Sequence, residues 1–488
     1  MASTIVTPRD ESDNDSFSSR NHHHHRSSSS SHSACSSATA ATTTSSRSTH
    51  KPHKAANEDA AWEAMRRLRL RKGPHPVGLE DFRVVRRLGG GDMGNVYLCR
   101  IRKAAPAARG YGDDDDDEHV YYAMKVVDRE AVAMRNKLKR AEMEKEILSI
   151  VDHPFLPTLY AEFEASHFSC YLMEFCPGGD LYAARLRQPG SRFSVSSAKF
   201  YAAEIVVALE YLHMMGIVYR DLKPENVLVR HDGHIMLSDF DLSLKTDVVP
   251  KLLLTPKTTS SSPSPPPSSS PLLSCFSTKP RRHKTTPSSS SSSAVVVVVA
   301  EPTSTTTRSK SLVGTHEYLA PEVISGEGHG GEVDWWTLGV LLYELLYGIT
   351  PFKGETNERT LRNIMKQPVR FPKTKMKERD DREEMKVVED LIRKLLVKNP
   401  KKRMGSWMGA AEIKRHEFFE GVNWALIRWA GPPEVPPSGN YCRGFDLKKK
   451  GNSGVLVPKG RKEKERGNNN EAFRITSGGG HYHHFDYF

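Results

Sequence analysis

The chain of 488 residues has only six cysteines and no long apolar run. The cysteines lie far apart, without the spacing of metal ligands, so we expect reduced thiols in a cytosolic protein. No apolar run follows charged residues near the N-terminus, and the sequence therefore predicts no secretory signal. The longest apolar run, residues 294–300, is far shorter than the roughly 20 residues of a membrane span. Any membrane attachment is therefore expected to be peripheral.

Two long stretches lack the apolar residues that a core requires. Ser, His and Thr dominate the first 50 residues, and we expect residues 1–75 to be a disordered, low-complexity N-terminus. Residues 245–308 are rich in Ser, Pro, Thr and Val and predict a disordered basic insertion. The formal net charge of +12 suggests acidic partners such as anionic phospholipids or nucleic acid. Because the chain shows no recognisable nucleic-acid-binding module, we expect no nucleic-acid partner.

Residues 219–241 carry the most informative chemistry. The stretch begins Y-R-D-L-K-P-E-N and ends D-F-D. A hydroxyl that attacks a phosphoryl group needs a residue that accepts its proton and holds it in line, and Asp221 suits that role. Asn226 and Asp239 offer the hard oxygen ligands that Mg2+ prefers beside a triphosphate. A turn signal at Asp232 between two β-like runs predicts a hairpin that sets Asn226 and Asp239 side by side.

A nucleotide site is predicted upstream. The pattern G-x-G-x-x-G-x-V comprises Gly89, Gly91, Gly94 and Val96. Alone it fits a dinucleotide fingerprint or an ordinary loop, but the β-rich residues that follow favour a glycine hairpin over nucleotide phosphates.

Lys125 lies in a buried-looking strand, where an ammonium group needs anionic partners. ATP phosphates and the carboxylate of Glu144, on a predicted helix, would supply them. The alternative is an edge-strand lysine whose ammonium group reaches solvent.

These motifs, with A-P-E at residues 320–322 and Arg403, occur in the order of the protein kinases over roughly residues 80–430. More narrowly, the chain resembles the plant AGC-type kinases of the group AGC VIII. D-F-D in place of D-F-G, the long insertion and the motif G-T-H-E-Y at residues 314–318 carry that resemblance. It implies an α+β, two-lobed kinase fold at residues 82–419, with a β-rich N-lobe and a helical C-lobe. An AGC-type C-terminal tail would follow at residues 420–488.

The resemblance also implies a serine/threonine kinase that uses ATP and Mg2+. Lys223 would join Asp221 and Asn226 in catalysis, and the backbone near Glu174 and Cys176 would bind adenine. Acidic side chains at three further positions match those with which the family reads substrate arginines, through carboxylate–guanidinium pairing. They are Asp180, Glu225 and Glu344.

Activation and partners are likewise implied by the resemblance. A phosphoinositide-dependent kinase would dock on the terminal F-x-x-F, Phe485 and Phe488, and phosphorylate Ser311, with Ser309 as a further candidate. A phosphate at Ser311 would pair with Arg220 and order the loop. The implied substrates are PIN-type auxin carriers, with roles in polar auxin transport and organ formation.

Several readings stay open from the residues alone. Residues 62–72 predict a basic helix that either lies on an anionic membrane or docks on the following domain. The basic cluster at residues 279–284 fits phospholipid binding, a nuclear signal or a merely solvated charge run. The expected location is the cytoplasm and the peripheral plasma membrane, with the nucleus as an alternative. Asp241, in place of glycine, leaves a pseudokinase scaffold as the second functional hypothesis.

Overall fold

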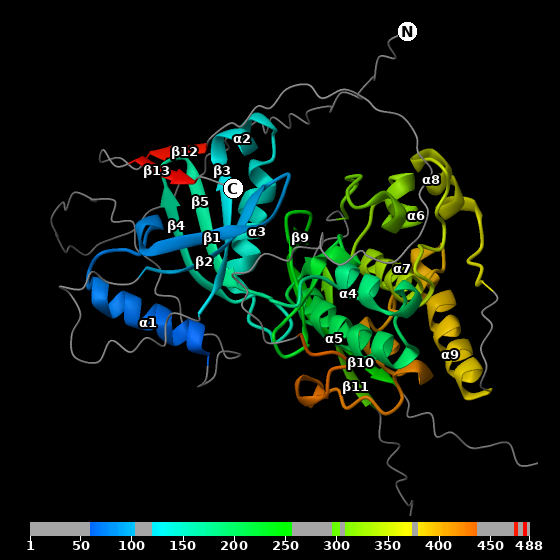
Figure 1. The fold of residues 1–488 in the computed structure, drawn as a ribbon. Coiled ribbons are helices and arrows are strands. Elements are labelled where there is room, and N and C mark those ends of the chain that lie inside the picture. The colour runs from blue at the N-terminus through cyan, green and yellow to red at the C-terminus, as the bar shows by residue number, and fades with distance from the viewer. Residues whose placement is uncertain are drawn as a thin grey trace, which may run out of the picture. The chain divides into compact units, whose positions relative to one another are not determined.

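The structure, a computed structural model, describes residues 59–102, 120–255, 295–302, 308–372, 379–436, 473–476 and 482–485. A five-stranded sheet with its helices precedes a mainly helical region (Figure 1). The predicted α+β kinase fold, with a β-rich N-lobe and a helical C-lobe, is confirmed. No helix in these ranges is both long enough and apolar enough to cross a membrane.

The N-lobe sheet is antiparallel, with the strand order β1-β2-β3-β5-β4. Its strands are β1 (Phe82–Gly91), β2 (Gly94–Ile101), β3 (Tyr122–Asp128), β4 (Leu159–Ala165) and β5 (Phe168–Glu174). The glycine pattern forms the β1–β2 hairpin, with Gly91 paired to Gly94. A Cβ atom at Gly94 would lie only 2.2 Å from the carbonyl oxygen of Val126. Glycine is therefore required where β2 passes this close to β3.

Two helices, α2 (Arg129–Met134) and α3 (Leu138–Ile150), follow β3. The side chain of Asp128 caps α2 by accepting a hydrogen bond from Ala131 N at 3.0 Å. Helix α3 buries Glu144, Ile147 and Leu148 on one face, as their helical spacing predicts. This face brings a carboxylate toward the lysine of β3.

Helix α1 (Ala60–Lys72) corrects one expectation. Disorder was predicted through residue 75, but Trp62, Met65 and Leu68 are buried with the apolar residues of the N-lobe sheet. Their spacing of three residues makes a stripe on one helix face, and burying that stripe stabilises the helix. Arg69 adds a hydrogen bond of 2.5 Å to the carbonyl oxygen of Tyr160. Of the two roles left open for this segment, the structure shows docking on the following domain.

The C-lobe is built from seven helices in the part of the chain that the structure describes: α4 (Leu181–Arg187), α5 (Val195–Met214), α6 (Pro321–Ser325), α7 (Glu332–Tyr347), α8 (Asn357–Lys366), α9 (Arg379–Leu395) and α10 (Ala410–Lys414). Helix α5, with 20 residues, is the longest of these seven. Ser194 caps it, accepting from Ser197 N at 3.1 Å.

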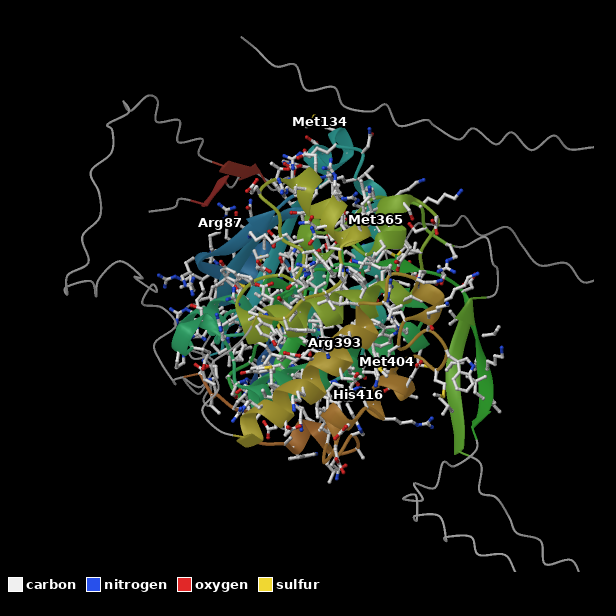
Figure 2. All side chains as sticks on the ribbon, turned by 90° about the vertical axis from the view of Figure 1, so that its right-hand side faces the viewer. Arg87, Met134, Met365, Arg393, Met404 and His416 are labelled. Atoms are coloured by element: carbon white, nitrogen blue, oxygen red, sulfur yellow. The ribbon has the colours of Figure 1, made fainter. Side chains whose placement is uncertain are left out.

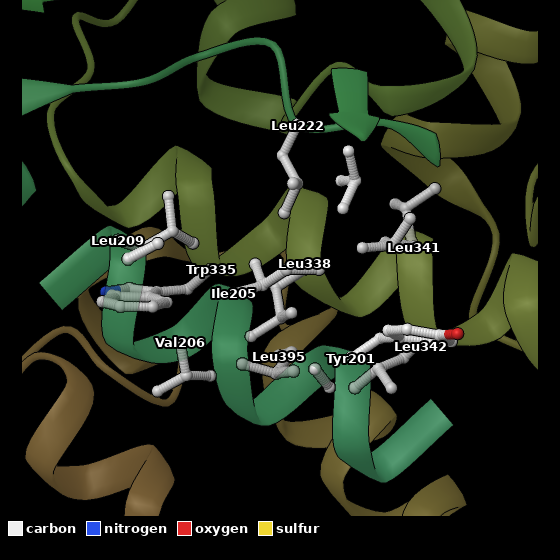
Figure 3. Packing of buried hydrophobic residues seen from close by; sticks show 14 of the residues in the cluster. Tyr201, Ile205, Val206, Leu209, Leu222, Trp335, Leu338, Leu341, Leu342 and Leu395 are labelled. Atoms are coloured by element: carbon white, nitrogen blue, oxygen red, sulfur yellow. The ribbon is translucent and has the colours of Figure 1, made fainter. Parts of the chain in front are cut away.

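Helices α5, α7 and α9 share one apolar core (Figure 3). Tyr201 and Ile205 of α5 lie with Leu338 of α7 and Leu395 of α9. Leu222, from the predicted catalytic loop, reaches the same cluster. The core thereby fixes the backbone beside Asp221.

Polar contacts also hold α9 in place. Asp390 pairs with His416 at 3.0 Å, and the guanidinium of Arg393 lies 4.5 Å from the ring centre of Phe371. Figure 2 labels Arg393 of α9 and His416. These contacts tie α9 to the segments on either side of it.

The remaining strands form four two-stranded sheets: β6 (Ile217–Val218) with β9 (Leu244–Lys245), β7 (Val227–Val229) with β8 (Ile235–Leu237), β10 (Val248–Thr255) with β11 (Val295–Pro302), and β12 (Phe473–Thr476) with β13 (Tyr482–Phe485).

The expected disorder of residues 245–308 is wrong for the two ends of that insertion, which form β10 and β11. The valine run pairs with the strand before it because β-branched residues favour extended backbone. The basic cluster at residues 279–284 lies outside the described residues.

The predicted tail begins as a packed segment rather than a free one. Ile427 is buried, Arg428 pairs with Asp232, and Glu434 accepts from Gln188 at 2.9 Å. In the terminal motif, Phe485 ends β13 and pairs with Phe473 in register. Phe488 lies outside the described residues.

Candidate active site

A cavity of about 410 Å³ collects most of the predicted nucleotide-site residues. The predicted ATP-site residues that line it are Gly89, Gly91, Gly94, Val96, Lys125, Glu144, Glu174 and Cys176. The predicted metal ligands Asn226 and Asp239 and two of the predicted substrate-reading acids, Asp180 and Glu225, line it as well. A larger hollow of about 890 Å³, between α5, α9 and residues 417–430, contains none of the predicted site residues. The smaller cavity is therefore the candidate active site.

Lys125 connects the N-lobe to the opposite wall of this cavity. Its Nζ donates to Glu144 Oε1 at 2.5 Å and to Asp239 Oδ1 at 3.4 Å. Burial alone would lower the pKa of Lys125, but the carboxylates of Glu144 and Asp239 outweigh it and raise that pKa. The lysine therefore stays protonated, as a residue that binds phosphate must.

The carboxylate of Asp221 has a fixed orientation. Oδ2 accepts from Lys223 Nζ at 2.7 Å and from Asn226 Nδ2 at 2.9 Å, while Oδ1 accepts from Thr315 Oγ1 at 3.3 Å. Lys223 also donates to Thr315 at 3.2 Å. Thr315 links the catalytic loop to the activation segment, the stretch between D-F-D at residues 239–241 and A-P-E at residues 320–322. Sequence reasoning missed this role.

Asp334, at the start of α7, positions the catalytic loop through hydrogen bonds to its backbone. Its carboxylate accepts from the backbone N–H groups of Tyr219 at 2.9 Å and Arg220 at 2.8 Å, and it contacts His213 at 2.7 Å. These bonds hold Arg220 in left-handed backbone, φ 67°, which a residue with a side chain seldom adopts. In the sequence, Asp334 is recognisable only as an acidic residue at the start of an apolar helix. The sequence does not indicate which groups it contacts.

Asn226 and Asp239 meet through the β7–β8 hairpin, as predicted. Ser238 N donates to Asn226 O at 2.9 Å, which brings the residue before Asp239 against Asn226. The Asn226 amide nitrogen donates to Asp221, so its side-chain oxygen would be the metal ligand. Asp239, like Arg220, has left-handed backbone, φ 60°.

Asp241 adds a second carboxyl group to the same cavity. Burial, and then the neighbouring carboxylate of Asp239, raise the pKa of Asp241 to about 7. A divalent cation fits this set of oxygen donors, because it would offset the charge that the two carboxylates bring together.

Tyr219 occupies the place where the kinase pattern has histidine. It is fully buried, its ring centre lies 5.5 Å from that of Phe240, and its hydroxyl donates to Ser238 O. The aromatic ring therefore packs in the core at this position.

Glu174 and Cys176 lie on the segment that joins the lobes. The carboxylate of Glu174 accepts from Arg230 at 2.5 and 3.1 Å. Any contact with an adenine would therefore come from the backbone of this segment. Arg230, which follows β7, is a buried cation that sequence reasoning missed. Its contact with Glu174 ties the joining segment to the C-lobe, and it also donates to Leu156 O, before β4, at 3.1 Å.

The three acids expected to read substrate arginines have different surroundings. Glu225 is exposed at the cavity, and Asp180 caps α4 by accepting from Ala183 N at 2.7 Å. Glu344 is only 8% exposed and accepts from Arg185 at 3.1 Å and from Tyr318 at 2.6 Å. A substrate arginine would have to displace Arg185 to reach Glu344.

Both predicted phosphorylation sites contact one arginine. Nη1 of Arg220 donates to Ser309 Oγ at 2.9 Å and to Ser311 Oγ at 3.1 Å.

Further along the segment, Glu322 accepts from Arg403 at 2.6 and 2.8 Å. The glutamate of A-P-E and Arg403 thus form a buried ion pair.

Comparison with known proteins agrees with this geometry. The chain matches the family model described as protein kinase domain over residues 82–261 and 298–419. It is 56% identical over 416 residues to Protein kinase PINOID 2 of Oryza sativa subsp. japonica, covering 79% of this chain and 83% of that protein. Protein kinase PINOID 2 of Arabidopsis thaliana is 52% identical over 439 residues, covering 79% and 81%. Protein kinase PINOID of Oryza sativa subsp. japonica is 48% identical over 394 residues, covering 80% and 76%.

Proposed function

Because the chain belongs to the protein kinase family, and within it to the plant AGC-type (AGC VIII) serine/threonine kinases, we propose that it phosphorylates PIN-type auxin carriers. The kinase activity rests above all on one observation: Asp221, with its partners Lys223 and Asn226, lies beside the cavity that contains the Lys125–Glu144 pair. The family implies ATP and a divalent metal, and we propose that the metal is Mg2+.

Each side chain then has a chemical task. Lys125 binds the α- and β-phosphates of ATP, and Glu144 keeps its ammonium group in place. Asp221 accepts the proton of the attacking hydroxyl and holds that oxygen in line with the γ-phosphorus. Lys223 lies close enough to offset the charge of Asp221. Asn226 and Asp239 would hold Mg2+, which neutralises negative charge on the triphosphate when bound.

The auxin-carrier role is supported by identities of 48–56% to kinases named PINOID and PINOID 2. Glu225 at the cavity suits a target serine preceded by basic residues. On this proposal the kinase works in the cytoplasm and at the inner face of the plasma membrane and regulates polar auxin transport and organ development. The nucleus is the alternative location, through the basic cluster at residues 279–284.

Wild-type protein is expected to transfer phosphate from ATP and Mg2+ to a hydrophilic-loop fragment of a PIN carrier. Asp239→Ala should transfer none above background, because it removes a metal ligand. Radiolabelled transfer, followed by mapping of the modified serines, measures both. If the wild type also transfers nothing after phosphorylation of Ser311, the pseudokinase scaffold becomes the better hypothesis, and Asp241 the residue to examine.

We further propose that a phosphoinositide-dependent kinase docks on Phe485 and Phe488 and phosphorylates Ser311. An apolar pair on a polar tail is suited to a pocket on such a partner. Replacing both phenylalanines by Ala should slow phosphate incorporation at Ser311 at least tenfold, whereas Tyr487→Ala, within the same motif, should have little effect. Equal rates for the two variants would contradict this docking mode.

Membrane association is proposed through the basic cluster. Liposomes with anionic phospholipid should retain the full-length protein, and replacing Arg281, Arg282 and Lys284 by Gln should weaken retention about 100-fold, since each of the three basic residues contributes about 1 kcal/mol near the surface. A matched control removes three exposed charges elsewhere, at Arg359, Lys386 and Lys401. Equal loss in both variants would mean that net charge alone, not this cluster, determines binding.

A further inference from the structure

Ser309, His329 and Arg220 meet where the activation segment passes the loop before α7. Ser309 and His329 form an antiparallel bridge, with N–H···O distances of 3.2 and 2.9 Å in the two directions. Side chains directly opposite each other in such a pair point to the same face. Nη1 of Arg220 lies 2.9 Å from Ser309 Oγ and 3.5 Å from His329 Nε2. One guanidinium nitrogen therefore joins the serine hydroxyl to the imidazole.

The imidazole of His329 is buried and incompletely bonded. It is 1% exposed, and among the described residues its Nδ1 has no hydrogen-bond partner. Arginine can only donate, so Nε2 accepts from Arg220 and the proton is on Nδ1. Leaving Nδ1 without a partner is unfavourable for a buried imidazole, while Nε2, on the side of Arg220, is the ring nitrogen that a phosphate beside this arginine would reach.

Electrostatics explain why the imidazole is neutral in this state. Burial, and then the positive charge of Arg220, lower the pKa of His329 to about 4. Arg308 acts in the same direction, while the carboxylates of Glu322 and Asp334 oppose it. An anion beside Arg220 would instead raise the pKa of His329, because it favours the protonated imidazole.

We propose that His329 and Arg220 together form a receptor for a phosphoryl group on Ser309, with the imidazole as the second cation of the site. The inference rests on the proposed phosphorylation of the activation segment. In that reaction the γ-phosphorus of ATP bonds to Ser309 Oγ, its bond to the bridging oxygen of ADP breaks, and the hydroxyl proton is released. The phosphoryl group brings close to two negative charges and three acceptor oxygens.

The backbone bridge distinguishes Ser309 from Ser311. Ser309 is tied to His329 by two backbone hydrogen bonds, whereas Ser311 is exposed and its N–H donates to Ser309 Oγ at 3.3 Å. The hydroxyls of the two serines lie 2.8 Å apart, so both reach Arg220. The imidazole is thus placed to bind a phosphate on Ser309, while a phosphate on Ser311 depends mainly on the arginine.

The test uses the full-length chain with phosphoserine installed at residue 309 alone or at residue 311 alone. In the unsubstituted chain, NMR of labelled histidine should show the pKa of His329 rising by about two units when Ser309 is phosphorylated, as expected for an adjacent opposite charge. Phosphoserine at 311 should raise it by less than half as much. Since no side chain of the receptor is replaced, this result does not depend on the folding of a variant.

A second measurement follows the phosphate. His329→Gln should raise the second pKa of phosphoserine 309, read by 31P NMR, by about one unit, because it removes a cation. It should change that of phosphoserine 311 much less. An unchanged histidine pKa, or equal shifts of the two phosphates, would overturn the proposal. Phosphate transfer by the same samples to the PIN-loop fragment tests the proposed kinase function separately from the receptor. If the NMR shifts occur without transfer, the receptor is supported and the proposed kinase function is contradicted.

Discussion

Replacing Asp221 with Asn is expected to lower kcat about 10²–10⁴-fold, the usual contribution of a positioned proton acceptor. Asparagine has almost the same shape but cannot accept the proton of the attacking hydroxyl. Its amide nitrogen would also face donors, since Lys223 and Asn226 both donate to Asp221 Oδ2. Steady-state transfer to the PIN-loop fragment measures the loss.

Two controls make that result specific. Affinity for ATP should change little in Asp221→Asn, because Lys125 and the glycine hairpin lie on the other side of the cavity and keep their contacts. Asp247→Asn, an exposed acid on the same segment as β9 and β10, should retain full activity. A chain with Asp221→Asn that keeps more than a tenth of wild-type kcat would show that Asp221 is not the proton acceptor.

The second large effect concerns stability. Arg403→Ala should lower the free energy of unfolding by about 3–5 kcal/mol, the usual effect of removing one partner of a buried ion pair. Arg403 is 1% exposed and makes a two-pronged contact with Glu322, and it also donates to Glu332 O at 2.7 Å. Its loss would leave a carboxylate buried without its cation. Denaturant unfolding measures the change.

The matched control is an exposed pair. Lys386 pairs with Glu383 at 2.7 Å, and both side chains are mostly exposed, so Lys386→Ala should change stability by well under 1 kcal/mol. Replacing Arg403 and Glu322 together by Met and Leu should restore part of the loss, because no buried charge is then left unpaired. A double variant less stable than Arg403→Ala would contradict this explanation.

Much of the candidate site could be predicted from local sequence. The glycine pattern, the lysine of β3 and the pair Asn226 and Asp239 lie within short motifs whose spacing is set by a hairpin or a strand. Helix α3 presents Glu144 with Ile147 and Leu148 because residues three and four apart share a helix face. These spacings involve few residues, and they are the same in any chain that forms the hairpin, strand or helix concerned.

Other features could not be predicted in the same way. The disorder expected through residue 75 extended over the basic helix that residues 62–72 predict, and three apolar side chains of this helix pack on the N-lobe sheet. The ends of the insertion pair as β10 and β11 although polar, proline-rich sequence separates them. In both cases the polar composition of the neighbouring sequence led to a prediction of disorder. The short apolar segment is nevertheless ordered, because it packs or pairs with residues distant in the chain.

The sequence by itself determined the chemistry of this protein: which residues could accept a proton, hold a metal or bind phosphate, and in what order they follow one another. Only the tertiary structure decided how those residues are held. Asp334 bonds the catalytic loop from 114 and 115 positions away, Arg230 joins Glu174 across 56, and Ser309 bridges to His329. Local periodicity predicts which face of a helix or strand a side chain occupies. Which polar groups contact one another depends on how whole helices and strands pack, because a buried polar group needs a hydrogen-bond partner in the folded protein.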